Sequence, residues 1–251
     1  MDIKFKMRAM VLCAGYGTRL GDLTKEIPKP MLPLQGHPIL AYILTHLQTH
    51  GFDQVAINLH FHPEIIKNYF ADGAKFKTSL TYVHEEKLLG TAGGIKNMES
   101  FLQQGDPFLV QYGDVVTDQD FTAMLKFHRE RKALATLLLH QRAKSNSVVT
   151  LDDQHRIVGF LERPSDEARQ GVVSNWVNSG ICLCQPEIFE SIPAGVACDL
   201  PRDIFPKLIS TGRIYGFLLS GYRCAIDSPQ RLAEAQSSIA EKRCGIVLPN
   251  P

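Results

Sequence analysis

Apolar and polar residues alternate along the first 140 or so positions in two distinct rhythms. Short, nearly continuous apolar runs, typical of strands covered on both sides, predict strands over residues 8–14, 54–59, 79–83, 107–112 and 133–140. Apolar residues at helical spacing predict helices over residues 38–50, 63–70, 91–102 and 120–131. Strands and helices that alternate with short connections indicate βαβ units. We therefore expect an α/β fold, a Rossmann-like, mixed, mainly parallel sheet flanked by helices.

The second half of the chain changes character, because strands follow one another with fewer helices between them. Strands are predicted over residues 148–151, 156–161, 176–184, 213–218 and 223–226, and helices over 201–210 and 229–242. This pattern favours a small antiparallel subdomain. No internal repeat or low-complexity linker marks a boundary, so we expect one domain over 1–251, with halves at about 1–140 and 141–251.

Composition and charge narrow the function classes. Lys and Arg total 27 and Asp and Glu total 26, a formal net charge of +1, which argues against a general nucleic-acid or membrane-surface binder. The apolar stretch at residues 10–14 is too short for a signal-peptide core, and no segment approaches the roughly 20 apolar residues that span a bilayer. The six cysteines form no C-x-x-C pair, which predicts buried free thiols. We expect a cytoplasmic protein.

A glycine loop follows the first predicted strand. Gly15 and Gly17 leave the carboxyl end of that strand, the edge at which open α/β sheets bind ligands, and their amides can bond phosphate oxygens. Arg19 and Lys29 add a fork-shaped donor and a point charge, as a triphosphate requires. Leu20 stands where a Rossmann fingerprint has its third glycine, and a Walker A Gly-Lys-Ser/Thr is absent. The spacing alone leaves an ordinary surface loop open.

The longer motif carries a resemblance. Gly15-Tyr16-Gly17-Thr18-Arg19-Leu20 followed by Pro28-Lys29-Pro30-Met31-Leu32-Pro33 resembles the signature of the sugar-1-phosphate nucleotidyltransferases, and further matches extend to about residue 235. The resemblance implies transfer of a nucleotidyl group from an NTP to a sugar 1-phosphate, with release of pyrophosphate and Mg²⁺ as cofactor. The catalytic residues it implies are Arg19, Lys29 and Asp114. The left-handed β-helix of some relatives is not expected, because no hexapeptide repeat occurs.

The resemblance also implies a nucleotide site. Its residues are Leu12, Ala14, Gly15, Gly17, Thr18, Glu85, Gly90, Thr91 and Gly113. Glu85 or Glu86 would lie at the base, and a carboxylate that only accepts hydrogen bonds suits the N1 and N2 donors of guanine, so we expect GTP. The segment around Gly90 and Thr91 opens a predicted helix, whose amides could face a ligand; the alternative is a helix cap by Thr91 with close packing at the glycines.

The sugar-phosphate and metal residues are implied by matches in the second half. Glu162 and Arg163 stand where the family commonly has Glu-Lys, and Asn178 and Gly180 match its N-[AS]-G-[IV] segment. Asp114, after a predicted strand, is expected to hold Mg²⁺.

The second metal ligand lies where the sequence departs from the family motif. Its family position is Ala225 here, but Asp227 would share the same strand face and is predicted to take over. A helix cap by Asp227 or Ser228 is the competing role.

Other functions remain compatible with these motifs. A cytidylyl- or uridylyltransferase acting on a sugar phosphate or a phosphocholine-like substrate is one alternative, favoured by the Ile226-Asp227-Ser228-Pro229 form of the last motif. A catalytically silent nucleotide-sugar sensor is another, which the alanine at position 225 would allow. The expected partners are the NTP and the sugar 1-phosphate, with no nucleic acid and no membrane, and a homo-oligomer is compatible with the sequence.

Overall fold

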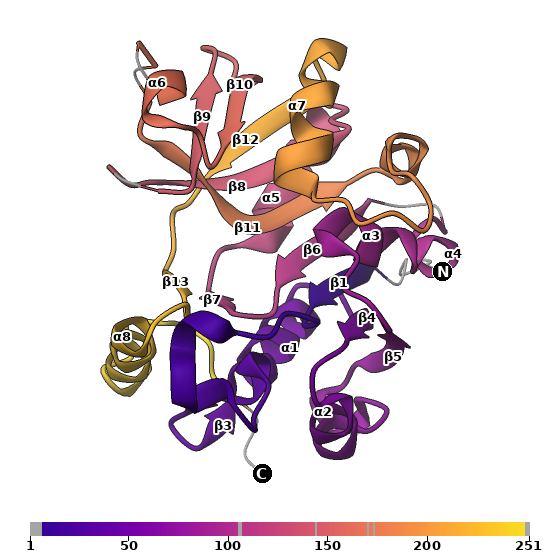
Figure 1. The fold of residues 1–251 in the computed structure, drawn as a ribbon, viewed down its shortest axis with the longest axis vertical. Coiled ribbons are helices and arrows are strands. Elements are labelled where there is room, and N and C mark those ends of the chain that lie inside the picture. Colours follow the sequence, from indigo (N-terminus) through magenta and orange to yellow (C-terminus); the bar gives the residue numbers. More distant parts are fainter. Residues whose placement is uncertain (1–6, 105–106, 144, 170, 173, 249–251) are drawn as a thin grey trace.

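A computed structural model describes residues 7–104, 107–143, 145–169, 171–172 and 174–248 (Figure 1). Its central sheet has nine strands among these residues and runs in the order β10-β9-β11-β6-β1-β4-β5, with β8 paired to β11 and β12 paired to β8. Helices cover both faces of the sheet, and no helix within these ranges is long and apolar enough to cross a membrane. The predicted mixed, mainly parallel sheet flanked by helices is confirmed.

The parallel part of the sheet is built by the first half of the chain. Its strands are β1 (Arg8–Leu12), β4 (Gln54–Leu59), β5 (Ser79–His84) and β6 (Phe108–Tyr112). Its helices are α1 (Ile39–Thr49), α2 (Pro63–Phe70), α3 (Gly90–Lys96), α4 (Glu99–Leu102) and α5 (Phe121–Glu130). β1 pairs in parallel with both β4 and β6, so the loop after β1 lies at the centre of the sheet's carboxyl edge.

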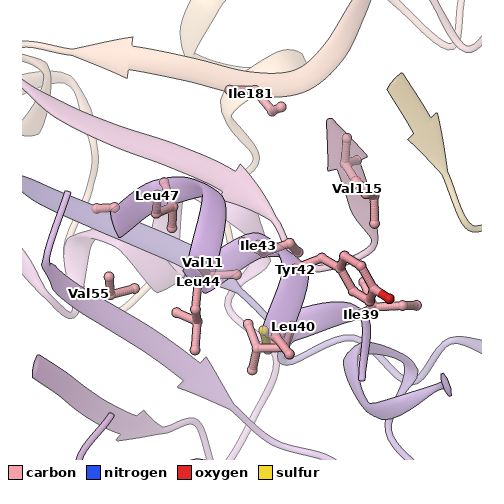
Figure 2. Close-up of a cluster of buried hydrophobic side chains, with 14 of the residues drawn as sticks. Val11, Ile39, Leu40, Tyr42, Ile43, Leu44, Leu47, Val55, Val115 and Ile181 are labelled. Atoms are coloured by element: carbon pink, nitrogen blue, oxygen red, sulfur yellow. The ribbon is translucent and has the colours of Figure 1, made fainter. Parts of the chain in front are cut away.

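Alternate residues of β1 enter two separate hydrophobic cores. Ala9 and Val11 pack into the core that contains α1, whereas Met10 packs into the core that contains α3 and α4. Figure 2 shows Val11 and Val55 against Leu44 and Leu47 of α1. This alternation is the period of two of a strand buried on both faces, and it explains why the sequence of β1 is almost wholly apolar.

The second half extends the same sheet. The strands are β8 (Ala135–Gln141), β9 (Ser147–Leu151), β10 (Ile157–Glu162), β11 (Trp176–Cys184) and β12 (Ile214–Leu218). β11 is antiparallel to β6, β8 and β9, so it joins the parallel part to the antiparallel part. The helices here are α6 (Asp166–Arg169), α7 (Phe205–Leu208) and α8 (Pro229–Ala240).

Two predicted helices are broken in the structure. The helix expected over residues 91–102 becomes α3 and α4, separated at Asn97 and Met98. The helix expected over 201–210 is a π turn (Leu200–Ile204), α7 and a 3₁₀ turn (Ile209–Thr211). Pro206 has no N–H to donate to the preceding turn, which accounts for the irregular start of the second helix.

The sequence prediction missed several short elements. These are β2 (Pro33–Leu34), β3 (His37–Pro38), β7 (Val115–Thr117), α6 and the 3₁₀ turns Thr18–Thr24, Lys29–Met31, Ala74–Phe76 and Pro186–Ser191. β7 pairs antiparallel with β13 (Arg223–Ala225), which sets Ala225 opposite Val115. This small ladder brings the last motif of the chain beside the end of β6. The six cysteines are free and buried, as predicted.

Candidate active site

Two adjoining cavities lie at the carboxyl edge of the sheet. The first, of about 250 Å³, is lined by nine predicted residues: Leu12, Ala14, Gly15, Lys29, Glu85, Gly90, Thr91, Gly113 and Asp114. The second, of about 150 Å³, is lined by six: Arg19, Asp114, Glu162, Asn178, Gly180 and Asp227. Tyr112 and Asp114 line both cavities, so the two meet at the end of β6. Gly17, Thr18 and Arg163 line neither.

The glycine loop is shaped so that Lys29 packs beneath it. Gly17 has a φ of 70°, and a Cβ there would come within 3.3 Å of the Lys29 side chain. The carbonyl of Gly17 accepts hydrogen bonds from the Leu20 amide and the Thr24 hydroxyl, both at 3.0 Å. Gly17 therefore shapes the loop from behind, while Gly15 lines the cavity.

Lys29 and Asp114 form an ion pair at the boundary between the cavities. The Nζ–Oδ2 distance is 2.7 Å, and the two side chains are only 11% and 20% exposed. Pro28 and Pro30 flank the lysine in its 3₁₀ turn, which restricts the backbone that presents it. Gly113, directly before Asp114, lets the chain pass close to Cys13, since a Cβ there would lie 2.7 Å from the Cys13 sulfur.

Arg19 and Asp227 form a second ion pair, at 3.0 Å between NH1 and Oδ2. The helix cap is Ser228, whose hydroxyl accepts from the Arg231 amide at 3.2 Å, so Asp227 is not the cap of α8. The Ile226 amide donates to the Asp114 carbonyl at 2.8 Å and holds this segment beside Asp114.

The two aspartates suit a hard cation. Asp114 and Asp227 line the same cavity, and the described residues contain no group of three or more His, Cys, Asp and Glu side chains that could hold a metal ion. Two carboxylates completed by water and phosphate oxygens fit the way in which proteins bind Mg²⁺. Each carboxylate is paired with a cation in this structure, Asp114 with Lys29 and Asp227 with Arg19.

Glu85 is buried in the first cavity, whereas Glu86 is exposed. One Glu85 oxygen accepts from the Asn58 side-chain amide at 2.7 Å and the other from the Leu89 amide at 3.1 Å. The Asn58 oxygen in turn accepts from the Cys13 amide at 2.9 Å. This chain of hydrogen bonds ties the base of the glycine loop to the carboxylate. A carboxylate accepts about four hydrogen bonds, so Glu85 retains acceptor capacity.

The first amides of α3 are bonded within the protein. The Thr91 amide donates to the Asp199 carboxylate at 3.0 Å, and the Ala92 amide donates to the Cys198 carbonyl at 2.8 Å. A Cβ on Gly90 would lie 2.6 Å from that same carbonyl. The lack of a side chain at Gly90 therefore allows the segment at Cys198 and Asp199 to pack closely against the start of α3. The acceptors at this helix start are thus Asp199 and Cys198 rather than Thr91, while Gly90 and Thr91 also line the first cavity.

Three predicted sugar-side residues come together in the second cavity. The Gly180 amide donates to the Asn178 side-chain oxygen at 3.1 Å, which leaves the Asn178 NH₂ group as its donor to a ligand. Gly180 has a φ of 78° and a Cβ would lie 3.0 Å from the Tyr112 ring, so both backbone shape and space require glycine. Burial raises the pKa of Glu162 above its usual value. The Arg163 side chain, by contrast, is 80% exposed.

Several residues of the cavities were missed from sequence. They are Tyr112, Asp199, His140, Arg142 and Arg223. A usable signal existed for Arg223, because Arg223, Ala225 and Asp227 alternate along the chain and all line the second cavity. Tyr112 is the last residue of β6, His140 and Arg142 lie at and just after the end of β8, and Asp199 lies before α7; only the fold shows that these side chains line the cavities.

Comparison with known proteins places the chain in a family. A model of the nucleotidyl transferase family matches residues 8–241. A UTP–glucose-1-phosphate uridylyltransferase from Synechocystis is 38% identical over 220 residues, covering 82% of this chain and 56% of the relative. A mannose-1-phosphate guanylyltransferase from Mycobacterium tuberculosis is 32% identical over 235 residues, covering 92% of this chain and 64% of the relative. The chain thus spans between 56% and 64% of the length of these two relatives.

Solved structures share the fold. A UDP-glucose pyrophosphorylase complexed with UDP-glucose superposes with a TM-score of 0.80 at 20% identity, covering 94% of this chain and 99% of the other. HddC from Yersinia pseudotuberculosis, complexed with GMP-PN, gives a TM-score of 0.77 at 22% identity, covering 93% and 99%. The sequence motifs, the family match and the shared fold agree: this chain belongs to the nucleotidyl transferase family, among the sugar-1-phosphate nucleotidyltransferases.

Proposed function

We propose that the protein transfers a nucleotidyl group from an NTP to a sugar 1-phosphate and releases pyrophosphate. The observation that carries this proposal is the meeting of two cavities at Asp114, with the Lys29 ammonium 2.7 Å from its carboxylate. Such an arrangement suits two phosphorylated substrates that must react end to end. The first cavity would take the nucleotide and the second the sugar phosphate.

The reaction needs charge neutralisation more than proton transfer. A sugar-phosphate oxygen attacks the α-phosphorus, and the bond from that phosphorus to the β-phosphate oxygen breaks as pyrophosphate leaves. The attacking phosphate is already ionised near neutral pH, so no general base is required. Lys29 would lie between the α-phosphate and the attacking phosphate, where negative charge accumulates. Arg19 would neutralise the leaving pyrophosphate.

The resting ion pairs fit these roles. Lys29 and Arg19 are held by Asp114 and Asp227 until phosphate oxygens arrive. The carboxylates are then free to hold a divalent cation, which the family generally uses. Mg²⁺ is the cation we propose, and it would supply positive charge to the phosphate oxygens.

GTP is the nucleotide we propose. Glu85 supports this choice, because its buried carboxylate keeps acceptor capacity that would suit guanine N1–H and N2–H₂ donors. UTP is the second candidate, since the relative with 38% identity is named a uridylyltransferase.

A pyrophosphate-release screen tests the activity. The full chain is incubated with Mg²⁺ and each of four NTPs against a panel of sugar 1-phosphates, and phosphocholine is added to the panel as a non-sugar substrate. Product with a sugar 1-phosphate supports the proposal, and the preferred NTP identifies the base. Nucleotide-sugar binding without pyrophosphate release from any pair would support a silent sensor instead.

A further inference from the structure

The second cavity contains two arginines that have no acidic partner in the part of the chain that the structure describes. Arg142 and Arg223 both line it, and no ion pair within the described ranges includes either of them. The Arg223 guanidinium donates to the Ser179 carbonyl at 2.9 Å, while its Nε atom is buried and has no hydrogen-bond partner among the described residues. A desolvated guanidinium with an unused donor is costly unless an anion completes it.

His140 holds Arg223 in place as a neutral group. Its Nδ1 lies 2.9 Å from the Ser179 hydroxyl, and its Nε2 lies 3.5 Å from NH1 of Arg223. Burial, together with the charges of Arg223 and Arg142, lowers the pKa of His140 to about 3. A neutral imidazole can accept from the arginine without repelling it. His140 therefore orients the guanidinium without neutralising it.

The acids in this cavity do not supply the missing anion. Asp114 is paired with Lys29 and Asp227 with Arg19. Glu162 lies nearest to Arg163, at 3.9 Å, rather than to the cavity arginines. Arg223 lines the same cavity as Asp114, the residue at which the two cavities meet. An anion bound by Arg223 would thus lie next to the Lys29 site.

We propose that Arg223, assisted by Arg142, binds the phosphate of the sugar 1-phosphate, and that His140 is its positioning residue. The inference rests on the proposed function for the identity of this anion. Arg163, which the motif suggested for the same phosphate, has a side chain that is 80% exposed and lines neither cavity. The phosphate contact is thus assigned to Arg223 of β13 and not to Arg163 after the end of β10.

Isothermal titration calorimetry of the full chain with Mg²⁺ tests this assignment. The probes are α-D-glucose 1-phosphate, α-D-mannose 1-phosphate and inorganic phosphate, titrated into wild type, Arg223→Gln and Arg163→Gln. Arg223→Gln is expected to weaken binding of the probes by about 10- to 100-fold, the scale of one charge-assisted hydrogen-bonding contact. Arg163→Gln should stay within about twofold of wild type.

Folding is checked separately by thermal melting and by NTP binding, both of which Arg223→Gln should leave close to wild type. Arg223→Lys serves as a second variant, which keeps the charge but loses the fork, and an intermediate loss is expected. An equal or larger loss in Arg163→Gln, or no binding of any probe by wild type, overturns the assignment.

The assignment and the proposed function can also fail separately. Selective loss of probe binding in Arg223→Gln, together with no turnover in the pyrophosphate screen, would keep this anion site and refute the proposed catalysis.

Discussion

Arg19 and Asp227 lie 208 positions apart in the sequence, yet their side chains are joined at 3.0 Å across the second cavity. The pair is partly exposed, with side-chain exposures of 60% and 32%, so it contributes little to stability. Separating the two side chains would therefore cost little free energy. The ion pair is important because of the two segments that it joins. It connects the glycine loop after β1 to the segment before α8, the two ends of the family motif.

Lys29 offers the sharpest test of the proposed chemistry. Lys29→Ala is expected to lower turnover by about 100-fold or more, because it removes a preorganised charge from the reacting centre. The measurement is kcat for the substrate pair found in the screen, with circular dichroism to confirm the fold. Lys25→Ala is the matched control, since Lys25 is an exposed lysine of the same loop and pairs with the exposed Asp22. Turnover of Lys29→Ala within a few-fold of wild type would place Lys29 outside the site.

Much of the fold could be predicted from the hydrophobic pattern. β4, α2 and β11 have the predicted boundaries, because each is a regular element with a clear start and stop in the sequence. β7 was missed, since a three-residue strand has too few positions to show a period, whereas β13 was predicted one residue too long, over 223–226. The joining role of β11 was not predictable either, because pairing partners of a fully buried strand leave no mark on its own sequence.

The candidate site could be predicted where one continuous motif carries it. The glycine loop, Lys29 and Asp114 come together as expected. Arg163 shows the limit of motif reasoning, because it stands at the position of the family's lysine but its backbone φ of 47° and exposed side chain turn it away from the cavities. His140 and Arg142 could not be predicted as site residues, since nothing in the sequence of β8 and the loop after it indicates that their side chains line a cavity with Asp114.

The proposed role of Asp227 as the second metal ligand can be tested, because the competing role, the cap of α8, is filled by Ser228. Asp227→Asn is expected to raise the Mg²⁺ concentration for half-maximal rate by about tenfold or more, since it weakens an oxygen ligand. Asp114→Ala should abolish activity more completely. Ser228→Ala is the control. It removes the observed cap and should lower the free energy of unfolding by about 0.5–2 kcal/mol while leaving the Mg²⁺ dependence unchanged.

Asp227→Asn with an unchanged Mg²⁺ dependence would limit Asp227 to its ion pair with Arg19. The metal would then depend on Asp114 and the substrate phosphates.

The choice of nucleotide can be tested at two adjacent glutamates. Glu85→Gln is expected to lower kcat/KM for GTP by about 10- to 100-fold, because it replaces a charged acceptor with an amide that accepts at only one atom. Glu86→Gln changes the same charge on the exposed neighbour and should leave kcat/KM within about twofold. The measurement is kcat/KM for each NTP in all three proteins. A wild-type preference for CTP or UTP contradicts the GTP proposal, whatever the variants do.

The last prediction concerns the pH dependence of stability and rests on His128, which is fully buried. Burial and the nearby Arg129 and Arg213 lower the pKa of His128 to about 4. Its Nδ1 lies 2.8 Å from the Thr136 hydroxyl, a bond that the neutral ring satisfies.

Unfolded histidine titrates near 6.5, so the unfolded state binds a proton between about pH 6.5 and pH 4 while the folded state does not. Stability contributed by the neutral ring is therefore complete above pH 6.5 and is lost as the pH falls, by up to about 1.4 kcal/mol per pH unit.

Urea unfolding at pH 7.0, 6.0 and 5.0 in about 0.1 M salt measures this slope. His128→Gln should be less stable than wild type at pH 7, because it loses packing, but its free energy of unfolding should fall less steeply towards pH 5. His46 and His140 also have lowered pKa values and are present in both proteins, so their contributions cancel in the comparison. Parallel slopes for the two proteins would mean that His128 takes up its proton without unfolding, and the buried neutral ring would not be a source of acid sensitivity.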